Sequence, residues 1–202
     1  MTDTRTASGR RVVVLAHCML NQNTKPDRRA RFGGAVQPVL DVLAQEGLGI
    51  FQLPCPEIGF AGPWRFSQVI QQYDTPRYRD HCRDLVVGTV DQLEHCLRPT
   101  DDGEDYRIAI VGVEGSPSCG ITKVGRSTAW RGFPGAVAFD GRYPVGDGMG
   151  VFMQEFHREM DRRQLRTPPV FGLGLDIPEL DVATLATGFR SRLRAIFGNP
   201  TG

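Results

Sequence analysis

The stretch RIAIVGVEGSPSCG, residues 107–120, decides the fold class of this 202-residue chain. It begins with a run of apolar and β-branched residues and passes directly into a tight loop of Gly, Ser and Pro that carries Cys119. A continuous apolar run of this length is typical of a strand buried on both faces, as the strands of a parallel sheet are. We therefore expect a central parallel strand over Arg107–Val113 that ends in a cysteine-bearing loop.

Three further runs repeat this pattern, namely RVVVLAH at 11–17, GIFQL at 49–53 and PVFGLGL at 169–175. Segments with apolar residues at helical spacing lie between and after them, such as 78–97, which follows the cap-and-proline pair Thr75-Pro76. Strands that alternate with helices indicate an α/β fold with a doubly wound, mainly parallel sheet of the Rossmann or flavodoxin-like kind. The sequence predicts one such domain over 11–198, preceded by a disordered tail at 1–10.

Two long segments, 54–74 and 120–148, are rich in Gly, Pro and aromatic residues and do not fit the alternation. Loops of this length are usually functional or contain a short hairpin, and Asp140-Gly141 is a typical hairpin turn. We expect both segments to lie at the carboxyl edge of the sheet. Asp147 is expected to cap the helix that follows GDGMG.

The overall charge excludes several classes of partner. Lys and Arg number 24 against 23 Asp and Glu, giving a net charge of +1, so neither an extended nucleic-acid groove nor a membrane surface is expected. No apolar run is long enough to span a bilayer, and the polar N-terminus lacks the apolar core of a secretory signal. These features predict a cytoplasmic protein whose five cysteines do not form disulfides.

Three of the cysteines share a position relative to the strands. Cys18, Cys55 and Cys119 each fall just past the end of a predicted parallel strand, at the edge where ligands bind in open α/β sheets. We expect the three thiols to enter one site, the alternative being plain burial at strand ends. Cys82 and Cys96 lie instead on the apolar face of the helix after Pro76, where a thiol is usually a small buried hydrophobe.

Three thiolates with an open fourth position suit either Zn²⁺ or an iron–sulfur cluster. A cubane cluster normally takes four cysteines, so three would leave one iron free to act as a Lewis acid. A zinc site could recruit His17, but only if the chain turned sharply there, because adjacent strand residues face opposite ways. Glu57, in PCPE, is either a catalytic carboxylate or a partner of Arg65, and Ser116 either meets a substrate or shapes its own turn.

The motifs AHCMLNQNT (16–24), PCPEIG (54–59) and GVEGSPSCG (112–120) resemble the three signatures of the 2-thiouracil desulfurase family, and most closely a branch of related desulfidases. The similarity runs over about residues 11–175 and includes YDTPRYRDHC. The resemblance implies an oxygen-labile 4Fe-4S cluster bound by Cys18, Cys55 and Cys119, whose fourth iron captures the sulfur of a thiocarbonyl substrate. It also implies that Glu57 transfers protons and that Ser116 assists at the substrate.

The expected function is therefore non-redox removal of sulfur from a small thiolated nucleobase, nucleoside or similar compound. A non-catalytic metal-binding or sulfide-carrying module and a zinc hydrolase are the alternatives. The chain departs from the family pattern around His17 and in the segment IGFAGPWR (58–65), so thiouracil itself need not be the substrate. Trp64 or Phe60 could stack on a flat heterocycle, and Asn21, Asn23 and Lys25 could line the pocket or form a polar turn.

Overall fold

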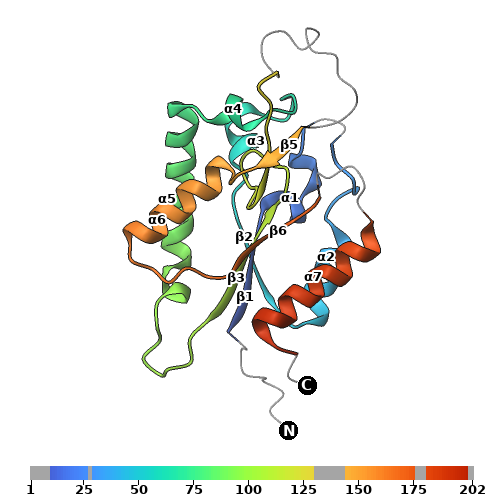
Figure 1. Ribbon diagram of the computed structural model, residues 1–202. Coiled ribbons are helices and arrows are strands. Elements are labelled where there is room, and N and C mark those ends of the chain that lie inside the picture. The colour runs from blue at the N-terminus through green and yellow to red at the C-terminus, as the bar shows by residue number, and fades with distance from the viewer. Residues whose placement is uncertain (1–9, 27–28, 130–143, 176–180, 200–202) are drawn as a thin grey trace.

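The computed structural model describes residues 10–26, 29–129, 144–175 and 181–199. Its centre is a four-stranded sheet of β1 (Arg11–Leu15), β2 (Gly49–Gln52), β3 (Arg107–Val113) and β6 (Val170–Leu173). The strands lie in the order β2-β1-β3-β6, and every pairing is parallel (Figure 1). The predicted α/β class with a parallel sheet is confirmed.

The apolar runs become strands because both of their faces are covered. In β3 every residue after Arg107 is buried, and the last three residues of β1 are buried beside it. The edge strand β2 is more exposed, since it has a neighbour on one side only. In the register, Leu15 pairs with Gln52 and with Val111, so the loops that follow these strands leave from the same edge of the sheet.

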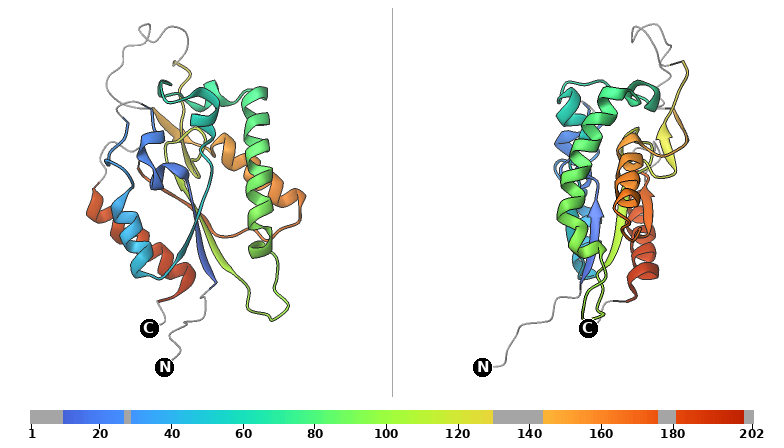
Figure 2. Two further views of the ribbon diagram at one scale, coloured as in Figure 1. Left: turned by 180° about the vertical axis from the view of Figure 1, so that it is seen from behind. Right: turned by 90° about the vertical axis from the view of Figure 1, so that its left-hand side faces the viewer.

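Four long helices cover the sheet: α2 (Gln37–Gln45), α5 (Pro76–Leu97), α6 (Val151–Arg162) and α7 (Val182–Phe197). Helices α5 and α6 pack together on one side, and α2 and α7 on the other (Figures 1 and 2). Each buries the apolar stripe that its sequence spacing indicates. No helix in these described ranges is long and apolar enough to cross a bilayer.

Helix α5 begins as the sequence predicts. The hydroxyl of Thr75 accepts a hydrogen bond from the backbone N–H of Tyr78 at 3.3 Å, and Pro76 occupies the first helical position. This cap satisfies one of the N–H groups that a helix start leaves unpaired, and Pro lacks the N–H that would need a partner there. The cap therefore fixes where the first turn of α5 lies relative to the sheet.

The two long loop segments contain short elements of their own. The first holds α3 (Pro56–Ala61) and α4 (Ile70–Tyr73), and the second holds the antiparallel pair β4 (Lys123–Gly125) and β5 (Val145–Asp147). The expected Asp140-Gly141 turn lies outside the described residues, as do residues 1–9 of the expected tail.

The prediction that Asp147 caps α6 is wrong. Asp147 lies in β5, where its carboxylate pairs with the ammonium of Lys123 at 2.5 Å. Helix α6 begins after Gly150 and has no side-chain cap. The N–H of Gly150 instead donates to the carbonyl of Gly120, and the N–H of Val151 donates to the carbonyl of Pro117. The loop that carries Cys119 therefore supplies the acceptors for the first N–H groups of α6.

Candidate functional site

The first cysteine is placed by a sharp turn after β1. The strand ends at Leu15, and the chain enters the short helix α1 (His17–Leu20), with Cys18 in its first turn. The predicted strand therefore ran two residues too far. Because the chain turns there, His17 and Cys18 line the same pocket, which consecutive residues of a continued strand would not do.

His17 is held against the neighbouring strand. Its Nδ1 lies 2.6 Å from Nε2 of Gln52, and an amide nitrogen can only donate, so Nδ1 is the acceptor. Burial lowers the pKa of His17 below its ordinary value of 6.5, an effect partly opposed by a hydrogen bond to the backbone of Leu53. The net lowering of the pKa and the acceptor role of Nδ1 are both consistent with a neutral imidazole in the wall of the pocket.

Cys55 follows the edge strand and opens a helix. The N–H of Leu53 bonds the carbonyl of Leu15 at 2.8 Å, which carries the pairing of β2 with β1 one residue past the strand end. Cys55 then occupies the N-cap position of α3, and Pro56 starts the helix. Burial raises the pKa of the Cys55 thiol above its ordinary value of 9.0, and the nearby Glu57 carboxylate adds to the increase.

Cys119 lies in a loop that is built by its own side chains. The Ser116 hydroxyl oxygen accepts hydrogen bonds from the N–H groups of Cys119 at 3.0 Å and Ser118 at 3.3 Å. The buried carboxylate of Glu114 accepts from three successive N–H groups beyond the cysteine, those of residues 121–123. Of the two roles considered for Ser116, the structure shows that the residue shapes its own turn.

The same loop leaves no room for side chains at two glycines. A Cβ on Gly112 would lie 2.3 Å from the carbonyl oxygen of Cys119, and one on Gly120 would lie 2.2 Å from that of Lys123. The N–H of Val113 also bonds the carbonyl of Cys119 at 2.9 Å, so the loop folds back onto the strand it leaves. The backbone around Cys119 is therefore fixed by close packing as well as by hydrogen bonds.

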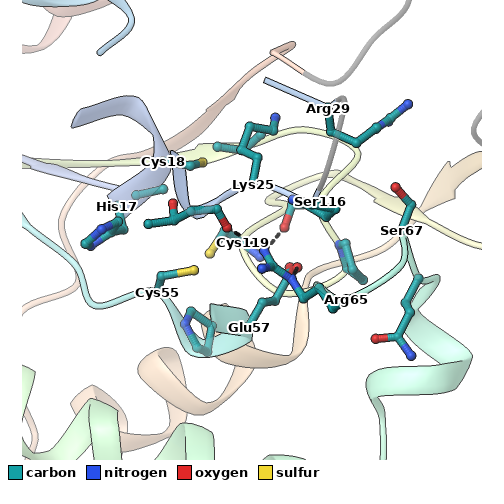
Figure 3. A pocket seen from close by; sticks show the side chains of 17 residues that line it. His17, Cys18, Lys25, Arg29, Cys55, Glu57, Arg65, Ser67, Ser116 and Cys119 are labelled. Atoms are coloured by element: carbon teal, nitrogen blue, oxygen red, sulfur yellow. Dashed lines mark hydrogen bonds and ion pairs between the residues drawn. The ribbon is translucent and has the colours of Figure 1, made fainter. Parts of the chain in front are cut away.

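The five residues that the sequence proposes as cofactor ligands or catalytic groups line one pocket at the carboxyl edge of the sheet. Cys18, Cys55 and Cys119 reach it from the loops after β1, β2 and β3, and Glu57 and Ser116 line it beside them (Figure 3). The other lining residues are Ala16, His17, Thr24, Lys25, Pro26, Arg29, Pro56, Arg65, Ser67, Gln68, Val113 and Pro117. Loops that are distant in the sequence thus form one site because parallel strands end at one edge.

The protonation of Cys119 is set by its surroundings. Cys119 is 9% exposed, and burial raises the pKa of its thiol well above 9.0. The nearby Cys18 and Cys55 raise it further. Thiols in this environment are protonated at pH 7 and lose their protons only to a compensating positive charge, such as a bound metal.

Glu57 is held at the pocket wall by Arg65. The Arg65 Nε lies 3.2 Å from Glu57 Oε2, with the two side chains 4% and 13% exposed respectively. The remaining guanidinium nitrogens donate to backbone carbonyls, Nη1 to Gly62 at 3.1 Å and Nη2 to Thr24 at 2.6 Å. Arg65 therefore joins the segment after Cys18 to the segment after Cys55.

Several pocket residues were not predicted. Arg29, Ser67 and Gln68 line it, and no sequence motif distinguishes them from ordinary loop residues. Of the three polar candidates after Cys18, only Lys25 is a lining residue, whereas the Asn21 side chain accepts a hydrogen bond from the N–H of Asn23 and so forms a local turn.

The two aromatic candidates have different surroundings. Phe60 packs edge-on against the ring of Tyr78 in α5, with the centroids 4.9 Å apart, and is 39% exposed. Trp64 is 89% exposed on the segment that carries Arg65. Stacking of Trp64 on a substrate stays a prediction.

The remaining two cysteines lie apart from the pocket lining. Cys82 is fully buried in α5, where burial raises the pKa of its thiol to about 12, and Cys96 is half-buried near the end of the same helix. The interpretation of Cys82 as a core residue is confirmed. None of the five cysteines forms a disulfide.

A single-ion geometry is not found in the described part of the chain: no group of three or more His, Cys, Asp or Glu side chains is arranged to hold one metal ion. A 4Fe-4S cluster makes a different demand, because each cysteine binds a separate iron at its own corner of the cubane. Three soft ligands in one partly buried pocket suit such a cluster by their chemistry.

The fold and the pocket define an α/β protein with a three-cysteine pocket at the carboxyl edge of a parallel sheet. No family model matches the chain. It is 27% identical over 154 residues to the uncharacterized protein MJ0003 of Methanocaldococcus jannaschii, a match that covers 76% of this chain and 80% of the relative.

Among solved structures, the chain is similar to the 4Fe-4S-dependent thiouracil desulfidase TudS. The TM-score is 0.45 and the identity 22%, and the match covers 86% of this chain and 97% of the other.

Proposed function

We propose that this protein is a non-redox desulfidase that binds a 4Fe-4S cluster through Cys18, Cys55 and Cys119. The observation that carries the proposal is that these three cysteines, supplied by three different strand ends, line one pocket together with Glu57 and Ser116. Its substrate is a small thiocarbonyl compound, such as a thiolated nucleobase or nucleoside. The overall reaction replaces C=S by C=O and releases hydrogen sulfide, with water supplying the oxygen and both protons.

The donor set fits this cofactor. Three thiolates leave a fourth corner of the cluster open, and the iron there supplies Lewis-acid chemistry to a thiocarbonyl when the cluster is bound. The raised pKa values of Cys55 and Cys119 mean that binding displaces protons, so loading is favoured as pH rises. We expect the protein to work in a reducing cytoplasm, where thiols stay available to bind a cluster.

Glu57 is the proton-transfer residue in this proposal. Its carboxylate lines the pocket, and Arg65 holds Oε2, which leaves Oε1 to accept a proton from water. Ion pairing with Arg65 and proton transfer are therefore compatible roles, because the guanidinium fixes the orientation of the carboxylate. The proton that Glu57 accepts can then return to the heterocycle or to the departing sulfide.

Ser116 can contribute to substrate binding without giving up its role in the turn. Its oxygen accepts the N–H groups of Ser118 and Cys119, and a hydroxyl has one further donor hydrogen. Because Ser116 lines the pocket, this hydrogen is available to a carbonyl or ring nitrogen of the substrate. The two accepted bonds hold the oxygen in place for that contact.

Anaerobic purification or reconstitution with ferrous iron and sulfide tests the proposal. We expect a brown protein that absorbs near ~400 nm, with four irons per chain, and that releases sulfide from thiouracil or thiouridine. Single Cys18→Ser, Cys55→Ser and Cys119→Ser variants should lose the cluster, and Cys96→Ser, outside the pocket lining, is the matched control. A loaded protein that releases no sulfide from a panel of thiocarbonyl compounds would be a carrier module. A colourless protein with stoichiometric zinc would refute the cluster.

A further inference from the structure

The first turns of α5 contact the loop of Cys119 directly. The Tyr78 hydroxyl lies 2.7 Å from Oγ of Ser118, the residue immediately before Cys119. Both Tyr78 and Ser118 are fully buried. Burial raises the pKa of Tyr78 well above its ordinary value, so the phenol is neutral and either hydroxyl can donate in this bond. The bond joins residues that are 40 positions apart in the sequence.

The same turns contact the loop of Cys55. His81 Nε2 lies 3.0 Å from the carbonyl oxygen of Pro56, the residue immediately after Cys55, and a carbonyl can only accept, so Nε2 donates. The imidazole also lies against Gly59, where a Cβ would be 3.4 Å from Cε1. Phe60 packs edge-on against Tyr78, so α3 rests on both α5 side chains.

We propose that Tyr78 and His81 are positioning residues that set the separation of Cys55 and Cys119. They are three positions apart on one rigid helix and so project from the same face, one toward each cysteine loop. Each of the two cysteine loops is bonded to α5 at the residue next to its thiol. The proposal rests on the proposed function in one respect, namely that the fixed separation serves a shared cofactor.

Thiol alkylation in the full-length, reduced, iron-free protein tests this coupling without the cofactor. The rates at which iodoacetamide modifies Cys18, Cys55 and Cys119 are measured by mass spectrometry. Tyr78→Phe keeps the ring and removes the bond to Ser118, so Cys119 should react about fivefold faster while Cys18 is unchanged. Ser118→Ala should have the same effect, and the double variant should add nothing to either.

Tyr73→Phe is the matched control. Tyr73 is also buried and packs on Tyr78 with ring centroids 4.5 Å apart, but its hydroxyl makes no hydrogen bond to the loop of Cys119. Equal Cys119 rates in Tyr78→Phe and Tyr73→Phe would overturn the role of Tyr78.

His81 has its own pair of variants. His81→Leu should raise the alkylation rate of Cys55 by a similar factor, because it removes the donor to Pro56. His81→Gln should restore the slow rate, since its amide nitrogen can occupy the position of Nε2. A glutamine variant that behaves like the leucine variant would mean that His81 acts by packing alone.

Reconstitution with ferrous iron and sulfide supplies the second readout. Variants that loosen either loop should change the electron paramagnetic resonance spectrum of the reduced cluster, whereas Tyr73→Phe should give the parent spectrum. Unaltered spectra in every variant would overturn the cofactor-directed part of the proposal. A parent protein that binds no cluster would refute the proposed function, and the alkylation rates would still decide whether α5 couples the two loops.

Discussion

The Arg65 guanidinium holds Oε2 of Glu57 at 3.2 Å while it donates to the carbonyls of Gly62 and Thr24. One buried side chain therefore orients the candidate proton-transfer residue and ties together the segments that follow Cys18 and Cys55. Removing it would leave a half-buried carboxylate and two backbone carbonyls without their partner. Arg65 therefore contributes both to the orientation of the Glu57 carboxylate and to the stability of the surrounding loops.

Arg65→Lys should lower both stability and activity. A lysine keeps the charge but cannot make the three directed bonds of a guanidinium, so at least one carbonyl is left unpaired. We expect the free energy of unfolding to fall by about 1–3 kcal/mol, measured by urea denaturation of the iron-free protein. The rate of sulfide release should fall more than stability alone explains, and a variant with parental turnover would contradict the orienting role.

Glu57→Gln should separate proton transfer from cluster binding. The amide is nearly isosteric with the carboxylate but cannot accept a proton from water at pH 7. We expect parental iron content and a turnover that is lower by about 10²–10⁴-fold, the usual contribution of a general base. Full activity on a verified substrate would show that the assigned role is wrong.

Gly112→Ala should disrupt the Cys119 loop. The new methyl group would lie 2.3 Å from the Cys119 carbonyl oxygen, so the loop must move or the strand must bend. We expect a loss of stability of about 1–3 kcal/mol or more and poor cluster loading. Gly88→Ala is the control, because a Cβ there in α5 meets no atom within 4 Å and alanine favours a helix by about 1 kcal/mol. Parental loading in Gly112→Ala would show that the loop tolerates displacement.

The stability of the protein should depend on pH through Glu159. The Arg162 guanidinium, and then that of Arg163, lowers the pKa of this carboxyl from 4.5 to about 2 in the folded protein. A depressed folded pKa means that the contribution is complete above about pH 4.5 and is lost as the pH falls toward 2. Glu159→Gln should therefore destabilise the protein at pH 7, with a difference from the parent that disappears near pH 2. Urea denaturation across this range measures it, and a difference that is constant with pH would contradict the assignment.

The sheet could be predicted because its strands are apolar on both faces. In β3 the apolar run and the observed strand coincide at Arg107–Val113, since every later residue is buried between two helix layers. The end of β1 was misplaced by two residues because the turn at Ala16 depends on packing that the apolar pattern does not encode. Asp147 was misassigned because its partner is Lys123 across the β4–β5 pair, a contact between strands too short to give a period-2 signal.

The pocket residues that directly follow a strand end could be predicted from the sequence. Cys18, Cys55 and Cys119 could be grouped because parallel strands end at one edge of a sheet. The three hydrogen bonds of Arg65 could not be predicted from the sequence. Its bond to Thr24 spans 41 positions and depends on the path of two irregular loops. Tyr78 was visible only as an apolar helix position, because periodicity does not show where a hydroxyl on that face finds its partner.

The origin of the three thiols in separate strand-end loops has a consequence for biosynthesis. A nascent chain exposes Cys18 and Cys55 well before the ribosome has added Cys119, and β3 must join β1 before the third thiol reaches the other two. No N-terminal fragment that ends before Cys119 can assemble the pocket. Any cofactor that needs all three ligands is therefore inserted only after the central strand has docked.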